Sequence, residues 1–298
     1  MEKQKTLVPW FQRGDIGGMT YSITNNIVNY LIVIATLSGV LDWPDKIVYG
    51  YVIPGMSIGL LCSGVYYAYM GRRLSKKEGR ADVTALPSGV STPAMFVMLY
   101  GVIMPLHYAL NDAELAWSAA VAACFIGGLF ETVLGSFLKP LRKFFPSVVT
   151  GTVVLSIGLS LIGVGISSFG GGSSAKDYGS LENLFVGFVV LIVIIVLKHG
   201  TKGFTSFSSI LIGIIVGYIL VSIMAMVLPT TFTYVDDTGA TVEATKAWVL
   251  NWDKVAQAKW FAVPALMPVK WVFDARAIVP ILIMFIVTAV ETVGDISG

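Results

Sequence analysis

Two acidic residues stand near the end of the chain in an otherwise apolar stretch. In AIVPILIMFIVTAVETVGDISG (residues 277–298), residues 278–290 are apolar except for Thr288, and Glu291 and Asp295 follow. A spacing of four places both carboxylates on one face of an α-helix, about one turn apart. Carboxylates accept hydrogen bonds from a ligand, and when buried they exchange protons near neutral pH. Either both acids lie within a membrane, where a charge costs roughly 2.5–3.5 kcal/mol and marks a functional site, or the helix has already reached the cytoplasmic interface and both acids are solvated.

The composition is that of a polytopic all-α membrane protein. Hydrophobic residues make up 55% of the 298 residues and charged residues only 13%, against about 25% charged residues in soluble domains. The net charge of +2 gives no indication of nucleic-acid binding. Cys62 and Cys124 lie in apolar segments, and neither His107 nor His199 has a second ligand at metal-binding spacing. The sequence therefore predicts neither a disulfide framework nor a metal site.

Apolar segments divide the chain into eight expected spans after a cytoplasmic lead (residues 1–16). The spans cover residues 17–40, 47–70, 83–106, 115–137, 147–166, 184–197, 208–228 and 275–298. An external loop (residues 229–274) precedes the last span. It contains TFTYVDDTGATVEA, whose alternation predicts a hairpin, and the amphipathic WVLNWDKVAQAKWF, expected at the membrane interface.

Basic residues orient these spans. The lead and the short loops on its side hold thirteen Lys and Arg, whereas the opposite short loops hold Lys46 and Lys176. Cytoplasmic loops carry the excess of Lys and Arg, so the sequence predicts a multi-pass protein of the cell (inner) membrane with a cytoplasmic N-terminus. The thirteen are Lys3, Lys5, Arg13, Arg72, Arg73, Lys76, Lys77, Arg80, Lys139, Arg142, Lys143, Lys198 and Lys202.

The first span is unusually polar in its first half. Asn25 and Asn29 are four residues apart and Ser22 lies about one turn before Asn25, so these side chains form a stripe, with Asn26 beside it. Polar side chains in membrane spans face the bundle interior or a cavity. We therefore expect Asn25, Asn26 and Asn29 to line a polar cavity.

The third span is interrupted by TALPSGVSTPAMF (residues 84–96). Proline disfavours helix in the residue before it, and Pro93 after Thr92 is typical of a helix start with Thr92 as N-cap. We predict extended chain over residues 83–86, a break over 87–91 and a half-helix from Thr92. Irregular backbone at membrane depth occurs only where it is buried in protein or lines a cavity, and half-helix N-termini point N–H groups at transporter substrates. Alternatively, the break lies in the cytoplasmic loop, which leaves a span of about fifteen residues, short of the usual 20 or so.

Glu131 is an acid in the fourth span with two interpretations. It belongs either to a buried polar network or to the interface near Lys139. Eight residues separate Glu131 from Lys139 and the span is ending there, which favours the interface.

These segments together resemble one transporter family. ETVGD at residues 291–295, RGD before an Asn-rich first span, ALPSGVSTP in the third span and PSVVTGTVVLSIGLSLIGVGI in the fifth are similar to the nucleobase–cation symporter-2 family, also called xanthine/uracil permeases or nucleobase–ascorbate transporters. The resemblance implies a fold of two inverted seven-span repeats, with the first repeat and the first span of the second in this chain. Residues 17–138 (spans 1–4) and 275–298 (span 8) then belong to a core domain, and residues 139–228 (spans 5–7) to a gate domain.

The resemblance also implies roles for single residues. Glu291 is similar to the glutamate that accepts hydrogen bonds from ring N–H groups of the base, and Asp295 matches the second polar position, linked with Glu291 to proton coupling. Backbone at the break would complete this half of the site. The Gln-His element in the first span of xanthine and uric acid members is absent, and Asn25 and Asn26 stand in that region. The expected contributors at the break are Pro87, Ser88, Gly89, Val90 and Ser91.

The expected function is proton-coupled uptake of a purine or pyrimidine base, of the xanthine, hypoxanthine, guanine or uracil class, by alternating movement of core against gate. A carboxylate accepts from ring N–H groups, and half-helix N–H groups donate to ring carbonyls. No organic cofactor or metal is expected. A proton is the expected coupling ion, with sodium as the alternative, and the resemblance implies a homodimer for the full-length protein. The expected partners are the base and the lipid bilayer.

Other function classes fit the residues less well. An anion transporter of the sulfate or bicarbonate type on the same architecture is the main alternative, but its site calls for a cation, and no Lys or Arg stands beside the break or Glu291. An intramembrane enzyme lacks support because an HExxH motif, a Ser/His pair and a paired-Asp motif are absent. A purely structural membrane protein is the least specific alternative.

Because family members carry about fourteen spans, we expect this stretch to be the N-terminal part of one, without the tenth-span acid and half of the gate. Residues 1–298 reconstituted alone into liposomes should therefore show no saturable uptake of radiolabelled xanthine or uracil. Saturable uptake would contradict this expectation.

Overall fold

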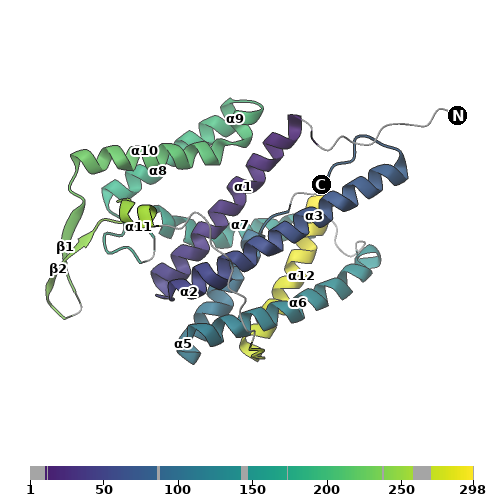
Figure 1. Ribbon diagram of the computed structural model, residues 1–298, viewed down its shortest axis with the longest axis horizontal. Coiled ribbons are helices and arrows are strands. Elements are labelled where there is room, and N and C mark those ends of the chain that lie inside the picture. The colour runs from purple at the N-terminus through teal and green to yellow at the C-terminus, as the bar shows by residue number, and fades with distance from the viewer. Residues whose placement is uncertain are drawn as a thin grey trace. The chain divides into compact units, whose positions relative to one another are not determined.

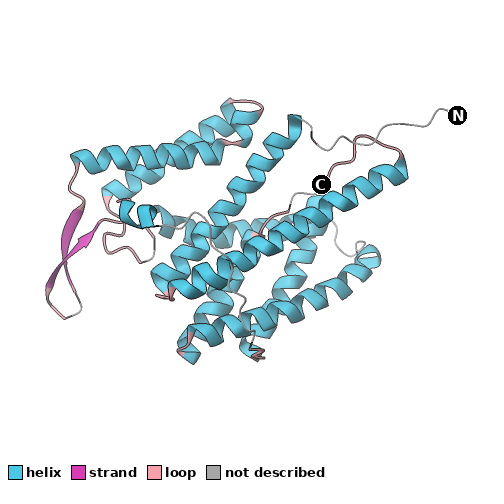
Figure 2. Ribbon diagram, viewed as in Figure 1, coloured by secondary structure: helices cyan, strands magenta, loops and turns pink. Residues whose placement is uncertain are grey.

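The computed structural model describes residues 11, 13–85, 88–141, 147–172, 174–236, 238–257 and 270–297 (Figure 1). Helices dominate this part of the chain, beside one small two-stranded sheet (Figure 2). Seven helical segments among the described residues are long and apolar enough to cross a membrane. The chain is therefore a polytopic, mostly helical membrane protein, as the composition predicts.

The bounds of the helices and strands follow the expected spans closely. In chain order, the elements are α1 (Arg13–Ile34), the π-helix η1 (Ala35–Val40), α2 (Asp45–Ile47), the π-helix η2 (Val48–Val52), α3 (Ile53–Glu78), α4 (Thr92–Phe96), the π-helix η3 (Val97–Ile103), α5 (Met104–Leu110), α6 (Ala113–Leu141), α7 (Ser147–Phe169), α8 (Leu181–Gly200), α9 (Phe204–Phe207), α10 (Ser209–Val227), β1 (Thr231–Val235), β2 (Thr241–Thr245), α11 (Trp252–Gln257) and α12 (Ala275–Ser297).

The sixth expected span was predicted too short. Residues 184–197 were expected, whereas α8 has 20 residues and begins at Leu181. Ser180 caps this helix, because its hydroxyl accepts a hydrogen bond from the backbone N–H of Asn183 at 3.3 Å. The expected span was too short because polar side chains in the first and last turns of α8 interrupt the apolar run from which it was predicted.

Two π-helical segments each end two residues before a proline. η2 ends at Val52, ahead of Pro54, and η3 ends at Ile103, ahead of Pro105. Proline lacks an N–H, and its ring clashes with the carbonyl oxygen four residues earlier. A local widening to π geometry is one of the known responses of a helix to such a disruption. We attribute each of these π segments to the proline that follows it.

The chain forms two compact units, each assembled from segments distant in sequence. The first comprises Met1–Val28, Ser57–Gly89 and Gly165–Ala262, and the second comprises Asn29–Met56, Val90–Val164 and Val263–Gly298. Within the first unit, α8 and α10 lie side by side (Figure 1). Within the second, α12 packs against α6 and against η3. The division into core and gate domains stays a prediction.

The hairpin predicted from alternation forms in the first unit. β1 and β2 pair antiparallel, from Thr231 opposite Thr245 to Val235 opposite Thr241. In the turn, the Asp236 carboxylate accepts hydrogen bonds from the Thr238 hydroxyl and from backbone N–H groups, which lowers the pKa of Asp236 below its usual value. Just after β2, the Lys246 ammonium donates to Glu182 at 2.5 Å. This ion pair anchors the hairpin to the start of α8. The interfacial segment expected after it falls partly outside the described residues, which show only α11.

In the second unit, α12 and α6 approach each other unusually closely. A Cβ placed on Gly127 of α6 would lie 2.4 Å from Cε2 of Phe285 and 2.8 Å from Cγ2 of Ile281. Small residues permit such close contact between membrane helices, and α6 also buries Ala116, Ala119, Ala120 and Ala123. At the start of α12, Asp274 accepts a hydrogen bond from the backbone N–H of Arg276 at 2.8 Å, and the Arg276 guanidinium lowers the pKa of Asp274.

Replacing Gly127 with alanine should destabilise the protein by roughly 1–3 kcal/mol, because the added methyl group forces Ile281 and Phe285 to move. Gly128→Ala is the matched control: its Cβ meets no described atom within 4 Å, and alanine favours helix over glycine. Thermal unfolding of the two variants in detergent measures the difference. Equal shifts in Tm would contradict the close contact.

Candidate substrate site

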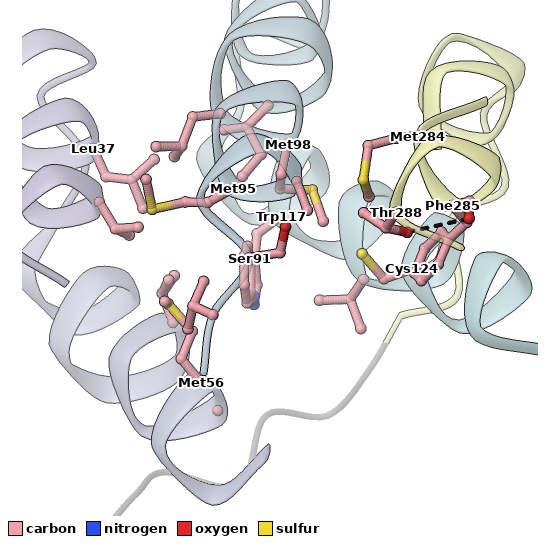
Figure 3. Close-up of a pocket in the computed structure, with 18 of the residues that line it drawn as sticks. Leu37, Met56, Ser91, Met95, Met98, Trp117, Cys124, Met284, Phe285 and Thr288 are labelled. Atoms are coloured by element: carbon pink, nitrogen blue, oxygen red, sulfur yellow. Dashed lines mark hydrogen bonds between the residues drawn. The ribbon is translucent and has the colours of Figure 1, made fainter. Parts of the chain in front are cut away.

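The second unit contains a cavity of about 590 Å³ (Figure 3). It lies between the end of α1, η1, η2, the start of α3, α4, η3, α6 and α12. Sites for small organic ligands typically have volumes of about 300–1,000 Å³ and apolar walls with a few polar groups. This wall is apolar apart from four oxygen-bearing side chains and the indole of Trp117. The four are Ser91, Glu131, Thr288 and Thr292.

One wall of the cavity is the start of α4, where the chain changes from extended to helical. Ser91 has extended backbone (φ −65°, ψ 117°) and precedes the first helical residue, Thr92. The helix begins at Thr92 as predicted, although its N-cap is Ser91, one residue earlier than expected. With η3 and α5 it continues to Leu110 over 19 residues, which is long enough to cross a membrane, so the break within the span stays a prediction. Among the described residues, nothing hydrogen-bonds to the buried hydroxyl of Ser91. Because a buried polar group without a partner is costly, this hydroxyl is suited to meeting a ligand or water in the cavity.

Asn29 holds the chain on both sides of Ser91. Its side chain is almost fully buried, at 2% exposure. The Asn29 amide donates to the carbonyl oxygen of Val90 at 3.1 Å, and the Thr92 hydroxyl donates to the Asn29 carbonyl oxygen at 3.3 Å. One asparagine of the predicted polar stripe therefore fixes the start of the half-helix.

The other two asparagines lie beside the break within the first unit. A Cβ on Gly89 would come within 3.8 Å of both Asn25 and Asn26. The Ser22 hydroxyl donates to the carbonyl oxygen of Ser88 at 3.1 Å, and the Ser63 and Ser88 hydroxyls are in hydrogen-bond contact. None of the three predicted asparagines is among the residues that line the cavity of the second unit. Of the three, Asn29 bonds to the interrupted chain, whereas the Asn26 amide donates to the carbonyl oxygen of Ser22 at 2.7 Å, on its own helix.

The other predicted site residues divide into two groups. Val90 and Ser91 line the cavity, as do Thr288 and Thr292 of α12. Glu291, between these threonines in sequence, is half-buried and does not itself line the cavity. Pro87 and the side chain of Asp295 lie outside the described residues. The structure thus brings the break and the polar stretch of α12 to one cavity.

Glu131 is a cavity residue that the sequence analysis assigned elsewhere. The alternative of a polar network gains support, because Glu131 lines the cavity and its carboxylate accepts a hydrogen bond from the Thr288 hydroxyl at 3.4 Å. A signal was present in the sequence: Gly127 lies one turn before Glu131, on the same helix face. Only the packing of α6 on α12 shows that this face points inward.

The charge of the cavity lining disfavours a ligand with a net negative charge. In the described part of the chain, its lining includes no Lys or Arg, and its one charged residue is Glu131. The wall also presents the rings of Trp117 and Phe285 (Figure 3), and aromatic rings stack on flat ligands. A flat, uncharged ring with N–H donors matches this set of groups.

Comparison with known proteins identifies the family. The model of a permease family matches residues 81–298, most of the chain. The chain belongs to this family. Its named members transport xanthine and uric acid, so the resemblance to nucleobase–cation symporters is confirmed, and the chain is classed with transporters rather than enzymes.

Several relatives match parts of this permease. A Clostridium perfringens protein with the provisional name of a purine permease is 37% identical over 178 residues, covering 60% of this chain and 34% of the relative. The uric acid permease PucK of Bacillus subtilis is 32% identical over 180 residues, covering 59% and 36%. The xanthine permease of Bacillus subtilis is 30% identical over 206 residues, covering 69% and 42%. The matched regions thus span only 34–42% of these relatives. No solved structure matches the chain.

Removing the Asn29 side chain should loosen the start of the half-helix. Asn29→Ala deprives the Val90 carbonyl oxygen and the Thr92 hydroxyl of their partner, which should cost roughly 1–3 kcal/mol of stability. Thr20→Ala on the same helix is the control, since the Thr20 hydroxyl bonds only to Ile16 one turn away. Thermal unfolding in detergent compares them, and an Asn29→Ala variant as stable as the control would argue against this clamp.

Proposed function

We propose that this permease takes part in uptake of a purine or pyrimidine nucleobase, of the xanthine, hypoxanthine, guanine or uracil class, across the cell (inner) membrane. Membership of the permease family and relatives named for xanthine and uric acid support this substrate class. The observation that carries the proposal is the cavity between the start of the half-helix and the polar stretch of α12, since it combines an unpartnered hydroxyl, a carboxylate and apolar walls without a cation.

The base would be held by complementary hydrogen bonds. Purines and pyrimidines carry N–H donors and carbonyl acceptors at the edge of a flat ring. The first N–H groups of a helix have no partner within the helix and attract electronegative atoms, so the N–H groups at the start of α4, together with Ser91, suit the ring carbonyls. Glu291, on the same stretch of α12 as the cavity-lining threonines, is the proposed acceptor for ring N–H groups, and the chain at residues 87–91 completes this half of the site.

Proton coupling follows from carboxylates placed near the base. Glu291 and Asp295 are one turn apart in α12, and protonation of either would change the charge that the bound base meets. Transport would then proceed by movement of the core domain against the gate, with the cavity open to one side of the membrane at a time. Sodium is the alternative coupling ion.

The topology proposed for this transporter rests on charge. Thirteen Lys and Arg in the lead and the short loops on its side, against two on the other side, support a cytoplasmic N-terminus. The hairpin between α10 and α12 would then be external. We propose that the complete protein is a homodimer.

An anion carrier on the same architecture is less consistent with the cavity. An anionic substrate needs a cation or several N–H groups around it, and its neighbour in this cavity would be the Glu131 carboxylate. Arg276, at the start of α12, is exposed and paired with Asp274. The site therefore favours an uncharged base.

Glu291→Gln in the complete transporter should abolish high-affinity base binding, because an amide oxygen is a weaker acceptor than a carboxylate. Equilibrium binding of radiolabelled xanthine, with hypoxanthine, guanine, adenine and uracil as competitors, measures the loss and identifies the preferred base. Glu243→Gln, on the exposed hairpin, is the control and should bind as the wild type does. Wild-type affinity in Glu291→Gln would remove the proposed role of this residue.

A further inference from the structure

Glu131 lies on the face of α6 that packs against α12. Gly127 on this face leaves no room for a side chain beside Ile281 and Phe285 of α12. Glu131 follows four residues later and therefore lies on the same face, one turn along. On α12, Thr288 likewise follows Phe285 by one turn, and the two polar side chains meet at 3.4 Å. Glu131 thus stands where two tightly packed helices border the cavity.

The Glu131 carboxylate has acceptor capacity beyond this contact. A carboxylate offers about four lone-pair positions. The Thr288 hydroxyl is the donor that the described residues provide, and its single hydrogen is shared with the carbonyl oxygen of Phe285 at 3.1 Å. The bond to Glu131 is the longer of the two and hence the weaker. Most of the hydrogen-bonding capacity of Glu131 is therefore available to a molecule in the cavity.

The surroundings of Glu131 provide few hydrogen-bond donors for its carboxylate. An acid within a membrane span is costly and functional by default, and the neighbouring wall is formed by apolar side chains such as Val121, Cys124 and Met284. An anionic ligand would be repelled, and an apolar one would leave the carboxylate without donors. A neutral ring with N–H groups supplies donors without adding charge.

We propose that Glu131 is a second carboxylate of the base site, which accepts a hydrogen bond from a ring N–H group of the base and thereby determines specificity. Thr288 is a positioning residue that orients the carboxylate. This inference rests on the proposed function and adds α6 to its site. The role proposed for Glu291, which does not itself line the cavity, is separate from this contact.

Methylated xanthines test the proposal, because each replaces one ring N–H with N–CH₃. Binding of radiolabelled xanthine to the complete protein in lipid nanodiscs is measured in competition with 1-, 3-, 7- and 9-methylxanthine. In Glu131→Gln, xanthine affinity should fall roughly tenfold to a hundredfold, the range for a hydrogen bond to a charged group. Affinity for the one analogue that lacks the facing N–H should stay close to its wild-type value, so discrimination between that analogue and xanthine is lost.

Three further variants separate this role from a structural one. Glu131→Asp keeps the charge and should retain part of the discrimination. Thr288→Val should weaken xanthine binding less than Glu131→Gln does. It should reduce discrimination between xanthine and the same methylated analogue. Glu114→Gln, at an exposed position of the same helix, should leave all affinities unchanged. Thermal unfolding of each purified variant verifies that it is folded.

Two results would overturn the inference while leaving the proposed function intact. The first is a wild-type protein that binds xanthine and every methylxanthine with equal affinity, or a Glu131→Gln variant in which the affinity ratios of xanthine to the methylxanthines are those of the wild type. The second is an equal loss of affinity for all analogues. A wild-type protein that binds none of the bases would instead overturn the proposed function.

Discussion

The structure depends on one constraint at the start of α4. The backbone N–H and carbonyl groups of the chain before this helix need hydrogen-bond partners. Chain interrupted by Pro87, Gly89 and Pro93 exposes N–H and carbonyl groups that an apolar environment does not tolerate without partners. Asn29 meets this need from α1 by bonding to residues on both sides of Ser91. The Ser91 hydroxyl, which has no hydrogen-bond partner among the described residues, is left at the cavity wall. Satisfying the backbone groups in this way leaves one unpartnered buried hydroxyl among the described residues that line the cavity.

The opposite wall of the cavity follows from a different constraint, the distance between two helices. Without side chains at Gly127, α6 and α12 approach until Ile281 and Phe285 fill the space. This contact sets the rotation of both helices about their axes. The rotation directs Glu131 and Thr288 toward each other and Thr292 toward the cavity. A glycine on one helix therefore decides which polar side chains of the next turn reach a substrate.

The proposed substrate class rests on the charge and the lining of the cavity. Apolar side chains and two aromatic rings provide most of the wall, and the polar groups are concentrated on α4, α6 and α12. These polar groups are the Glu131 carboxylate and the hydroxyls of Ser91, Thr288 and Thr292. The hairpin, held to α8 by the pair of Lys246 and Glu182, belongs to the other unit of the chain.

The sequence by itself determined the class of protein, the helical segments, the hairpin and the start of the half-helix. Apolar runs, proline positions and strand alternation are local signals, and they act through local backbone physics. ETVGD and the third-span motif also indicated the permease family. The tertiary structure alone decided that Glu131 borders the cavity and that Asn29 binds the interrupted chain. These facts depend on which residue of a second helix lies opposite, and helical spacing cannot specify a partner that is a hundred residues away.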